Sequence, residues 1–222
     1  MFPPQCAERG CDHQGEILVL AIVNSSLNRI KFRCQEANTV KRAIIIITAI
    51  VFVVSMMGTV FAADTKMLNW TANTVLAKFG ADKGIVKAVK AQNKKGTSLM
   101  MIKITDGAWK GVKTGTLAIM DELMANDCAV AAQALLESKP YIVEIFVMDD
   151  QGANVCMTAK TGDYWQGDEA KFVKSFNGGI GSVFVDEIEL DGGINVSQVS
   201  IPVMKKGTAI GAMTIAVDVD KL

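Results

Sequence analysis

The chain has 222 residues, of which 50% are hydrophobic, and its 23 basic side chains balance 23 acidic ones. This balance leaves no excess of Lys and Arg for phosphate contacts, so we expect no nucleic-acid partner. The only histidine is His13. A His-based metal site, a Ser/His/Asp triad and a CxxCH haem-attachment motif are therefore excluded from the body of the chain. We expect a globular protein without a cofactor or a metal.

An uncharged apolar run, Ala43 to Ala62, follows Lys41 and Arg42 directly. Basic residues, an apolar stretch and small residues before a cleavage point are the parts of a secretory signal peptide, so we expect cleavage after Ala62. The alternative is an uncleaved anchor, because about twenty apolar residues just span a bilayer core. The expected location is periplasmic or secreted, with anchoring in the inner membrane as the alternative.

The residues before this run are unusual for a targeting segment, since they contain three of the five cysteines and show no periodicity. Codons for Cys34–Ala37 can contain a ribosome-binding sequence eight nucleotides before codon 40, and Val can be encoded by the start codon GTG. We hypothesise that translation begins at Val40. Residues 1–39 are then a non-native or untranslated leader, residues 40–62 the signal peptide or anchor, and residues 63–222 a single domain. A long basic n-region is the alternative for the leader.

Two cysteines, Cys128 and Cys156, remain in the proposed domain, which contains no Arg and no His. An even pair in an oxidising compartment permits a disulfide. Cysteine is also a common core residue by itself, and a disulfide requires closely placed Cα atoms. We expect two independent buried thiols, with a disulfide as the alternative.

The first half of the domain has helical spacing. A stripe of apolar residues from Leu68 to Phe79 stops at Gly80, and a second helix is predicted from Ile85 to about Lys95. Residues 96–115 give a mixed pattern. The apolar spacing then predicts one long helix over residues 116–138, which Pro140 ends.

The second half has the pattern of strands. Strands are predicted at 142–148 and 153–159, joined by an Asp/Gly turn, and a short helix at 166–175. Three more strands follow at 182–190, 196–204 and 209–219. The predicted fold class is α+β: a five-stranded antiparallel sheet with a long N-terminal helix packed against it.

Five segments of this half carry a family resemblance. They read IVEIFVMDDQGANVCMT, TGDYWQGDEAKF, VFVDEIEL, VSQVSIPVM and AIGAMTIAVDV. As a set they resemble the extracytoplasmic Cache sensor domains, also called PAS-like or PDC domains. The resemblance covers residues 117–222 strongly and the earlier helices weakly. Typical relatives continue into a second membrane helix and a kinase, chemoreceptor or cyclase module, whereas this sequence ends at Leu222, so we expect a stand-alone form that signals through a partner.

The resemblance implies a ligand pocket beside the segment DYWQGDEAKF, which begins at residue 163. It implies Tyr164 and Trp165 as pocket walls, because aromatic rings give large rigid apolar surfaces, and Asp163 or Asp168 as polar contacts. The alternative is that Trp165 plugs the sheet and that Asp168 begins a helix, where a carboxylate meets the positive end of the dipole.

Three polar residues on the predicted strands complete the candidate site. Strand alternation places Gln198 and Ser200 on one side of their strand, and Asp186 lies on a strand predicted to face the same segment. The alternative is that these side chains only face solvent.

The expected function is binding of a small organic molecule, without catalysis. The expected partners are this ligand and a membrane receptor or kinase, and we include a homodimer through the N-terminal helix. One alternative is a membrane-anchored structural or assembly subunit. The other is a small enzyme, which would depend on Asp163 with Asp168, or on Cys156 as a nucleophile without a His base.

Overall fold

The computed structural model describes residues 65–222, and these residues belong to one compact unit. The expectations for residues 1–62, including the start at Val40 and the apolar run Ala43 to Ala62, concern segments outside this range. Within residues 65–222, every helix is too short or too polar to cross a bilayer.

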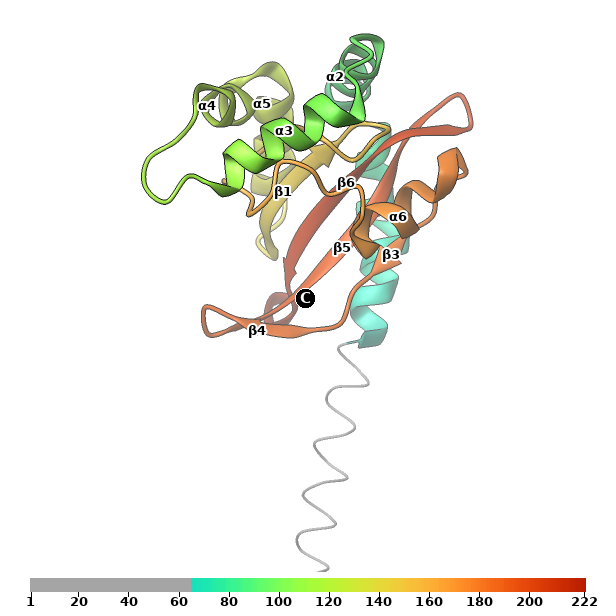
Figure 1. Cartoon of the computed structure of the whole chain (residues 1–222). Coiled ribbons are helices and arrows are strands. Elements are labelled where there is room, and N and C mark those ends of the chain that lie inside the picture. Colours follow the sequence, from blue (N-terminus) through green and yellow to red (C-terminus); the bar gives the residue numbers. More distant parts are fainter. Residues whose placement is uncertain (1–64) are drawn as a thin grey trace, which may run out of the picture. The chain divides into compact units, whose positions relative to one another are not determined.

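The centre of the unit is an antiparallel sheet of six strands (Figure 1). Its strands are β1 (Ile142–Met148), β2 (Asn154–Met157), β3 (Phe184–Val185), β4 (Glu189–Asp191), β5 (Ile194–Lys205) and β6 (Thr208–Asp218). The order across the sheet is β2-β1-β6-β5-β3, and β4 pairs with β5 outside this path. The long strands β5 and β6 pair along their whole length, so the chain's last two strands form the middle of the sheet.

Both faces of the sheet are buried, as β1 shows most clearly. Successive side chains of a strand point to opposite faces. Ile145 and Val147 belong to one apolar cluster, whereas Phe146 and Met148 belong to another. The domain therefore has two cores, one on each side of the sheet.

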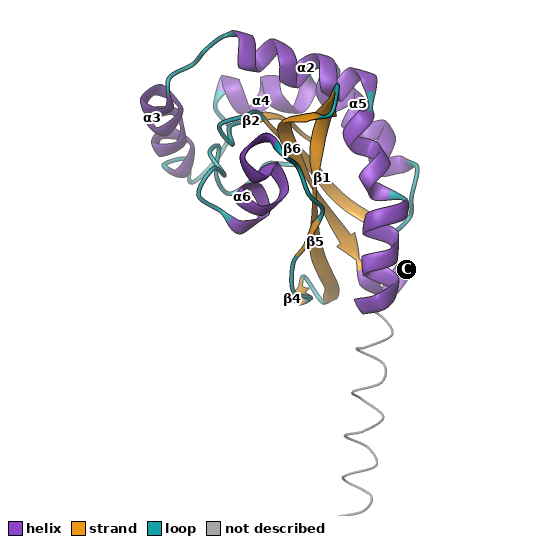
Figure 2. Cartoon of the chain, turned by 90° about the vertical axis from the view of Figure 1, so that its right-hand side faces the viewer, coloured by secondary structure: helices purple, strands orange, loops and turns teal. Residues whose placement is uncertain are grey.

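The first core lies under a helix over residues 65–74, the 3₁₀ helix η1 (Leu76–Ala81), α2 (Lys83–Lys94) and α5 (Asp127–Glu137). Figure 2 shows the helix over residues 65–74 and α5 on one side of the sheet, with α6 and α3 on the other. The helices contribute buried residues to this core at helical spacing. They include Leu68, Ala72, Leu76, Ile85, Val89, Cys128 and Ala132.

The second core lies on the opposite face, where α3 (Leu99–Lys110), α4 (Ala118–Ala125) and α6 (Ala170–Phe176) contribute. It includes Ile102, Trp109, Met120, Phe146, Met157, Tyr164 and Phe172. Short 3₁₀ turns, η2 (Asn177–Gly179) and η3 (Val219–Lys221), follow α6 and β6. The fold class expected from the sequence, α+β with an antiparallel sheet, is confirmed.

The single helix predicted over residues 116–138 is wrong, because Asn126 divides it into α4 and α5. Asn126 has an extended backbone, and its Oδ1 atom accepts a hydrogen bond from the Ala129 amide at 2.9 Å. Its Nδ2 atom donates to the Val155 carbonyl at 3.0 Å, which fixes the junction to β2. Asn is a favoured N-cap residue for this reason.

The strand predicted at 182–190 is also corrected. It is two short strands, β3 and β4, so the sheet has six strands instead of five. The second of them turns back at Gly192 and Gly193, both at positive φ, to pair with the start of β5. The short helix predicted at 166–175 begins later, at Ala170, because residues 163–169 form a loop over the sheet.

Cys128 and Cys156 form a disulfide, with their Cα atoms 5.7 Å apart. The expectation of two independent thiols is therefore wrong. The packing of α5 on β2 brings together two cysteines that are 28 positions apart in the sequence. This packing was not readable from the sequence, which gives only the separation.

We expect reduction of this disulfide to lower the free energy of unfolding by about 3 to 4 kcal/mol, because the bond closes a loop of this length in the unfolded chain. Denaturant unfolding with and without a thiol reductant measures the difference. A Cys128→Ala/Cys156→Ala variant is the control and should not respond to reductant. Equal stability of the fully reduced and oxidised wild-type proteins would contradict the expectation.

Candidate ligand-binding site

Polar side chains lie in one row across the sheet, at the end of its second core. Glu144 on β1 is in register with Ala216 on β6, which is in register with Gln198 on β5. The methyl group of Ala216 is small, so the surface is hollow between the two longer side chains. In the next row, the buried hydroxyls of Ser200 and Thr214 bond to each other at 2.9 Å.

A loop over residues 158–169 forms the roof above this row. Asn154 on β2 donates from Nδ2 to Thr161 Oγ1 at 2.8 Å and to the Asp163 carbonyl at 3.0 Å. The same carbonyl also accepts from Thr161 Oγ1 at 2.7 Å and from Gln166 Nε2 at 2.8 Å. The Asp163 carbonyl oxygen thus accepts three hydrogen bonds from buried side chains. These bonds hold the loop in place over the sheet.

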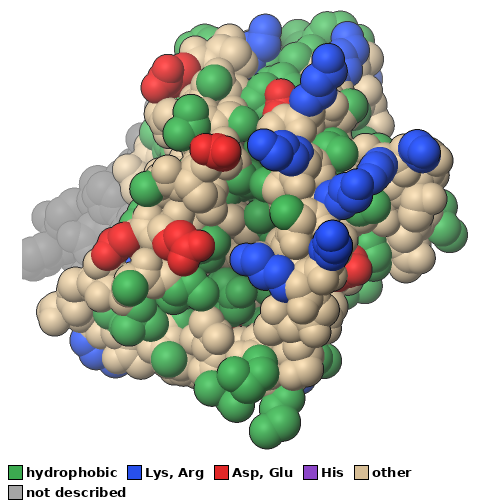
Figure 3. Space-filling view, turned by 90° about the horizontal axis from the view of Figure 1, so that it is seen from above, with side chains coloured by type: hydrophobic (Ala, Val, Ile, Leu, Met, Phe, Trp, Pro, Cys, Tyr) green, Lys and Arg blue, Asp and Glu red, His purple; other side chains and the backbone are tan. Residues whose placement is uncertain are grey.

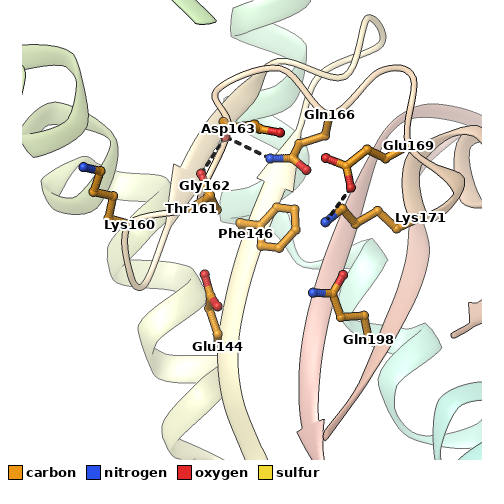
Figure 4. A pocket seen from close by; sticks show the side chains of 10 residues that line it. All are labelled: Glu144, Phe146, Lys160, Thr161, Gly162, Asp163, Gln166, Glu169, Lys171 and Gln198. Atoms are coloured by element: carbon orange, nitrogen blue, oxygen red, sulfur yellow. Dashed lines mark hydrogen bonds and ion pairs between the residues drawn. The ribbon is translucent and has the colours of Figure 1, made fainter. Parts of the chain in front are cut away.

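The row of Glu144, Ala216 and Gln198 on the sheet and the loop above it border an open cavity of about 340 Å³. This volume is in the range of small-molecule sites, but the lining is more polar than is usual for them. Figure 4 shows that its side chains come from β1, β5, the loop and α6. The lining residues are Glu144, Phe146, Lys160, Thr161, Gly162, Asp163, Gln166, Glu169, Lys171 and Gln198.

Gln166 has an unsatisfied acceptor in this cavity. The residue is only 2% exposed, and its Oε1 atom has no hydrogen-bond donor in the part of the chain that the structure describes. Its Nε2 atom is held by the Asp163 carbonyl, so the amide cannot turn its oxygen elsewhere without losing that bond. In Figure 4 the oxygen points away from the loop, toward the space between Phe146 and Lys171. Buried polar atoms are normally paired, so this one is available to a donor from outside.

Glu144 is the second group without a partner. Its carboxylate makes no hydrogen bond or ion pair with any residue between 65 and 222. Burial raises the pKa of Glu144, while the charge of Lys171 acts in the opposite direction and Asp191 adds to the increase. Burial therefore disfavours the charged carboxylate, and a cation bound beside it would favour it.

The two lysines of the cavity differ in their surroundings. Lys171 pairs with Glu169 at 2.9 Å, and its ammonium lies 5.3 Å from the centre of the Phe146 ring. Its charge is thus already compensated. Lys160 is exposed, and in Figure 4 its side chain points away from the centre of the cavity.

Helix α3 holds the roof loop from the outside. Asp106, which is 7% exposed, accepts from the amides of Tyr164 and Trp165 at 3.0 and 3.1 Å. Trp109 donates from Nε1 to the Thr161 carbonyl at 2.9 Å. Lys110 pairs with Asp106 at 2.8 Å and reaches Asp163 at 3.4 Å. Asn154 of β2 and helix α3 therefore hold the loop by hydrogen bonds from opposite sides.

The structure brings two of the seven residues predicted from the sequence to this cavity, Asp163 and Gln198. The predicted aromatic walls lie outside it. Tyr164 is buried against Trp109, with ring centres 5.6 Å apart, and burial raises its pKa to about 12. Trp165 donates from Nε1 to the Gln151 carbonyl at 2.8 Å and so fastens the loop to the β1–β2 turn.

The other three predicted residues also lie elsewhere. Asp168 is exposed on the loop, and Ser200 is buried in the same row as Phe146, with its hydroxyl paired to Thr214. Asp186 lines a separate hollow beside the helix over residues 65–74. Strand alternation correctly put Gln198 and Ser200 on one face of the sheet. Only Gln198, which lies at the end of the apolar core, reaches the cavity.

Eight of the ten lining residues were not selected from the sequence, among them Glu144 and Gln166, whose side chains have unpaired acceptors among residues 65–222. Glu144 is the only charged residue in the strand Ile142–Met148, which was a usable indication in a strand buried on both faces. Gln166 lies inside the motif YWQGDE, between residues with more conspicuous side chains. Its role depends on the fold of the loop, which the sequence pattern does not indicate.

No model of a known protein family matches the chain, and no curated protein matches it. Solved structures do match. The sensor domain of the histidine kinase DctB from V. cholerae is 12% identical with a TM-score of 0.39, over 75% of this chain and 56% of that one. The ligand-binding domain of the Pseudomonas aeruginosa PAO1 amino acid chemoreceptor PctC, in complex with GABA, is 14% identical with a TM-score of 0.34, over 60% of this chain and 57% of that one.

A third match is the sensory domain of the Campylobacter jejuni chemoreceptor Tlp3 with isoleucine bound, 12% identical with a TM-score of 0.32, over 70% of this chain and 62% of that one. The chain thus spans less than two thirds of the length of each of these structures. All three are sensor or ligand-binding domains, the class of protein that the sequence motifs resemble. With TM-scores below 0.5, they add no weight to a functional assignment, which has to come from the residues of the cavity.

We expect Glu144→Gln to raise the melting temperature at pH 7, because the variant keeps the shape of the side chain without its buried charge. The pKa of Glu144 is higher in the folded state than in the unfolded chain, where it is about 4.3. Below the unfolded value the carboxyl is neutral in both states and its contribution to stability is fully present. This contribution is lost as the pH rises through the pKa of the folded state. The gain from the variant should therefore disappear below about pH 4.

Thermal unfolding across this pH range checks the expectation. Glu187→Gln, at an exposed position before β4, is the matched control and should change stability by less than about 0.5 kcal/mol at either pH. A gain for Glu144→Gln that is equally large at low pH would show that burial of its charge is not the cause.

Proposed function

We propose that this protein is a periplasmic or secreted ligand-binding sensory module. It binds a small organic molecule with an ammonium or other N–H donor group in the cavity between Glu144, Gln166 and Gln198. It acts by binding, without turnover, and signals through a membrane receptor or kinase partner.

The observation that carries this proposal is the unpaired Oε1 atom of Gln166. An unsatisfied buried acceptor costs about 1–3 kcal/mol, and a donor on a ligand recovers this cost. The loop that presents the atom is held by buried hydrogen bonds from Asn154 and by Asp106 of α3. The acceptor is therefore fixed before a ligand arrives, and little ordering is needed on binding.

The charges of the cavity favour a ligand with a positive group. The carboxylate of Glu144 has no cation partner among residues 65–222, whereas the ammonium of Lys171 is paired with Glu169. An ammonium between Glu144 and Gln166 Oε1 would satisfy both acceptors. Such a charge-assisted hydrogen bond is about twice as strong as a neutral one.

Signalling requires that the ligand favours one of two states of the domain. The roof loop is bonded to α3 through Asp106 and Trp109, so the loop and α3 move together relative to the sheet when a ligand binds. This is the route that we propose toward a partner. We extend the proposal to a homodimer through the helix over residues 65–74, where Trp70 and Met67 are exposed.

The enzymatic alternative is weakened by one observation. Cys156 is bonded to Cys128, so it is not available as a free nucleophile. Asp163 lines the cavity but Asp168 does not, so these two carboxylates do not form an acid–base pair there.

Native mass spectrometry of the protein as purified, followed by a thermal-shift screen, tests the proposal. The screen compares amines and amino acids with carboxylates that lack an amine. We expect an ammonium compound to raise the melting temperature, because a ligand that binds the folded state stabilises it by mass action. No bound compound and no stabilisation by any amine would contradict the proposal.

For a compound found in this way, we expect Gln166→Met and Glu144→Gln each to weaken binding at least about tenfold, since each removes one charge-assisted hydrogen bond. Isothermal titration calorimetry measures the dissociation constant. Gln133→Met and Glu187→Gln, both at exposed positions away from the cavity, are the matched controls. Unchanged binding by both cavity variants would place the ligand elsewhere.

A further inference from the structure

Helix α3 has two apolar sides. Its inner side, with Ile102 and Trp109, is buried against the second core. Its outer side carries Met100, Ile104 and Ala108, spaced four residues apart and therefore aligned along the helix. Met100 is 73% exposed and Ile104 is 54% exposed. We call these three residues the outer stripe of α3. Large apolar side chains at such exposure, aligned on one face, commonly mark an interaction surface.

Lysines lie on α3 and directly before and after it in the sequence. Between residues 94 and 113 the chain has five lysines and a single acidic residue, Asp106. Asp106 is buried and already bonded to Lys110 and to the roof loop, so its charge is compensated. The lysines are Lys94, Lys95, Lys103, Lys110 and Lys113. Lys110 is paired with Asp106 and Asp163, and Lys103 lies over the Trp165 ring at 4.5 Å. Lys94, Lys95 and Lys113 are exposed, have no carboxylate partner among residues 65–222, and place positive charge directly before and after the helix.

Lysines are also exposed on α2. Figure 3, which looks down on the domain from above, shows a row of lysine side chains across the upper and right-hand part of the view, and hydrophobic side chains protrude at its lower edge. Lys83, Lys87 and Lys90 are exposed on α2. The β5–β6 turn adds Lys205, whose pKa is lowered by its close contact with Lys90. Lysines held this close repel one another, and an anionic partner would relieve the repulsion.

The shape and composition of this surface fit a lipid bilayer better than a macromolecule. Met100 and Ile104 are 73% and 54% exposed and lie one turn apart on a helix, so both side chains protrude from the surface. Protein interfaces are enriched in aromatic residues, Met and Arg and depleted in Lys; the outer stripe contains Met100 but no aromatic residue, and the charged residues near it in the sequence are mostly lysines. Single-stranded nucleic acids need aromatic side chains for stacking, and the outer stripe has none.

We propose that α3 docks this domain on the surface of an anionic lipid bilayer. The outer stripe enters the boundary between headgroups and acyl chains, as in interfacial amphipathic helices. The lysines on and beside the helix contact the anionic headgroups, and their flexible stems let the ammonium groups stay at the surface. This inference does not depend on the ligand cavity, because it uses the side of α3 that faces away from it.

The test uses the chain from Ala63 onward, which contains the whole sheet and both core clusters. The protein is sedimented with vesicles of phosphatidylcholine alone and with vesicles that contain phosphatidylglycerol. We expect binding to the anionic vesicles that weakens as salt is added, and little binding to the neutral ones, because the Debye length shortens with ionic strength.

Two sets of variants separate the apolar and the charged contributions. Met100→Asp/Ile104→Asp should abolish binding, and Lys94→Glu/Lys95→Glu should weaken it at least about twentyfold, since each lysine near an anionic surface contributes about fivefold. Val130→Asp/Leu190→Asp is the matched control, because these side chains are 65% and 76% exposed on other elements. Circular dichroism verifies that each variant is folded.

The absence of binding to anionic vesicles would overturn the proposal, as would wild-type binding by Met100→Asp/Ile104→Asp. Sedimentation velocity without lipid measures whether the protein forms a dimer. If the wild-type protein forms a dimer that this variant abolishes, and vesicles do not bind, the outer stripe is an interface between two copies of the chain and the lipid proposal is wrong.

Discussion

The arrangement of this domain depends on one constraint, the burial of both faces of its central sheet. Because helices cover each side, alternate residues of β1 enter different cores, Ile145 and Val147 on one side and Phe146 and Met148 on the other. From Ile145 onward every side chain of this strand is buried, and only its first residues reach solvent. Glu144 is therefore conspicuous: it lies where the second core ends, with its pKa raised by burial.

The cavity exists because the cover over this end of the sheet is a loop instead of a helix. A loop has backbone groups that need partners, and here the side chains of Asn154, Thr161 and Gln166 satisfy them. Most buried polar groups here are used in holding the loop, and among residues 65–222 two buried side-chain oxygens have no partner, Asn154 Oδ1 and Gln166 Oε1. Gln166 is the one of these two residues that lines the cavity. Gly167 and Gly152 permit the close approach of the loop to the β1–β2 turn, since a Cβ atom on Gly167 would lie 2.5 Å from the Gln151 carbonyl.

Helix α3 links the two surfaces for which we propose functions. Its inner side grips the roof of the cavity through Asp106 and Trp109, and its outer side carries the exposed stripe of Met100 and Ile104. A helix that is held mainly by a loop can respond to a movement of that loop. If both proposals hold, binding in the cavity and docking on a membrane act on the same element and are thermodynamically coupled.

The sequence by itself determined the helical first half, most of the strands, the turn at Asp149–Gly152, and hence the α+β class, because local spacing and turn chemistry act between near neighbours. It also indicated Asp163 and Gln198. It did not indicate α3, which lies in the mixed pattern of residues 96–115. Only the tertiary structure decided the disulfide, the break at Asn126 and the row of Glu144, Ala216 and Gln198. These features depend on strand register and helix packing between residues far apart in the chain, and a pattern along one sequence does not contain that information.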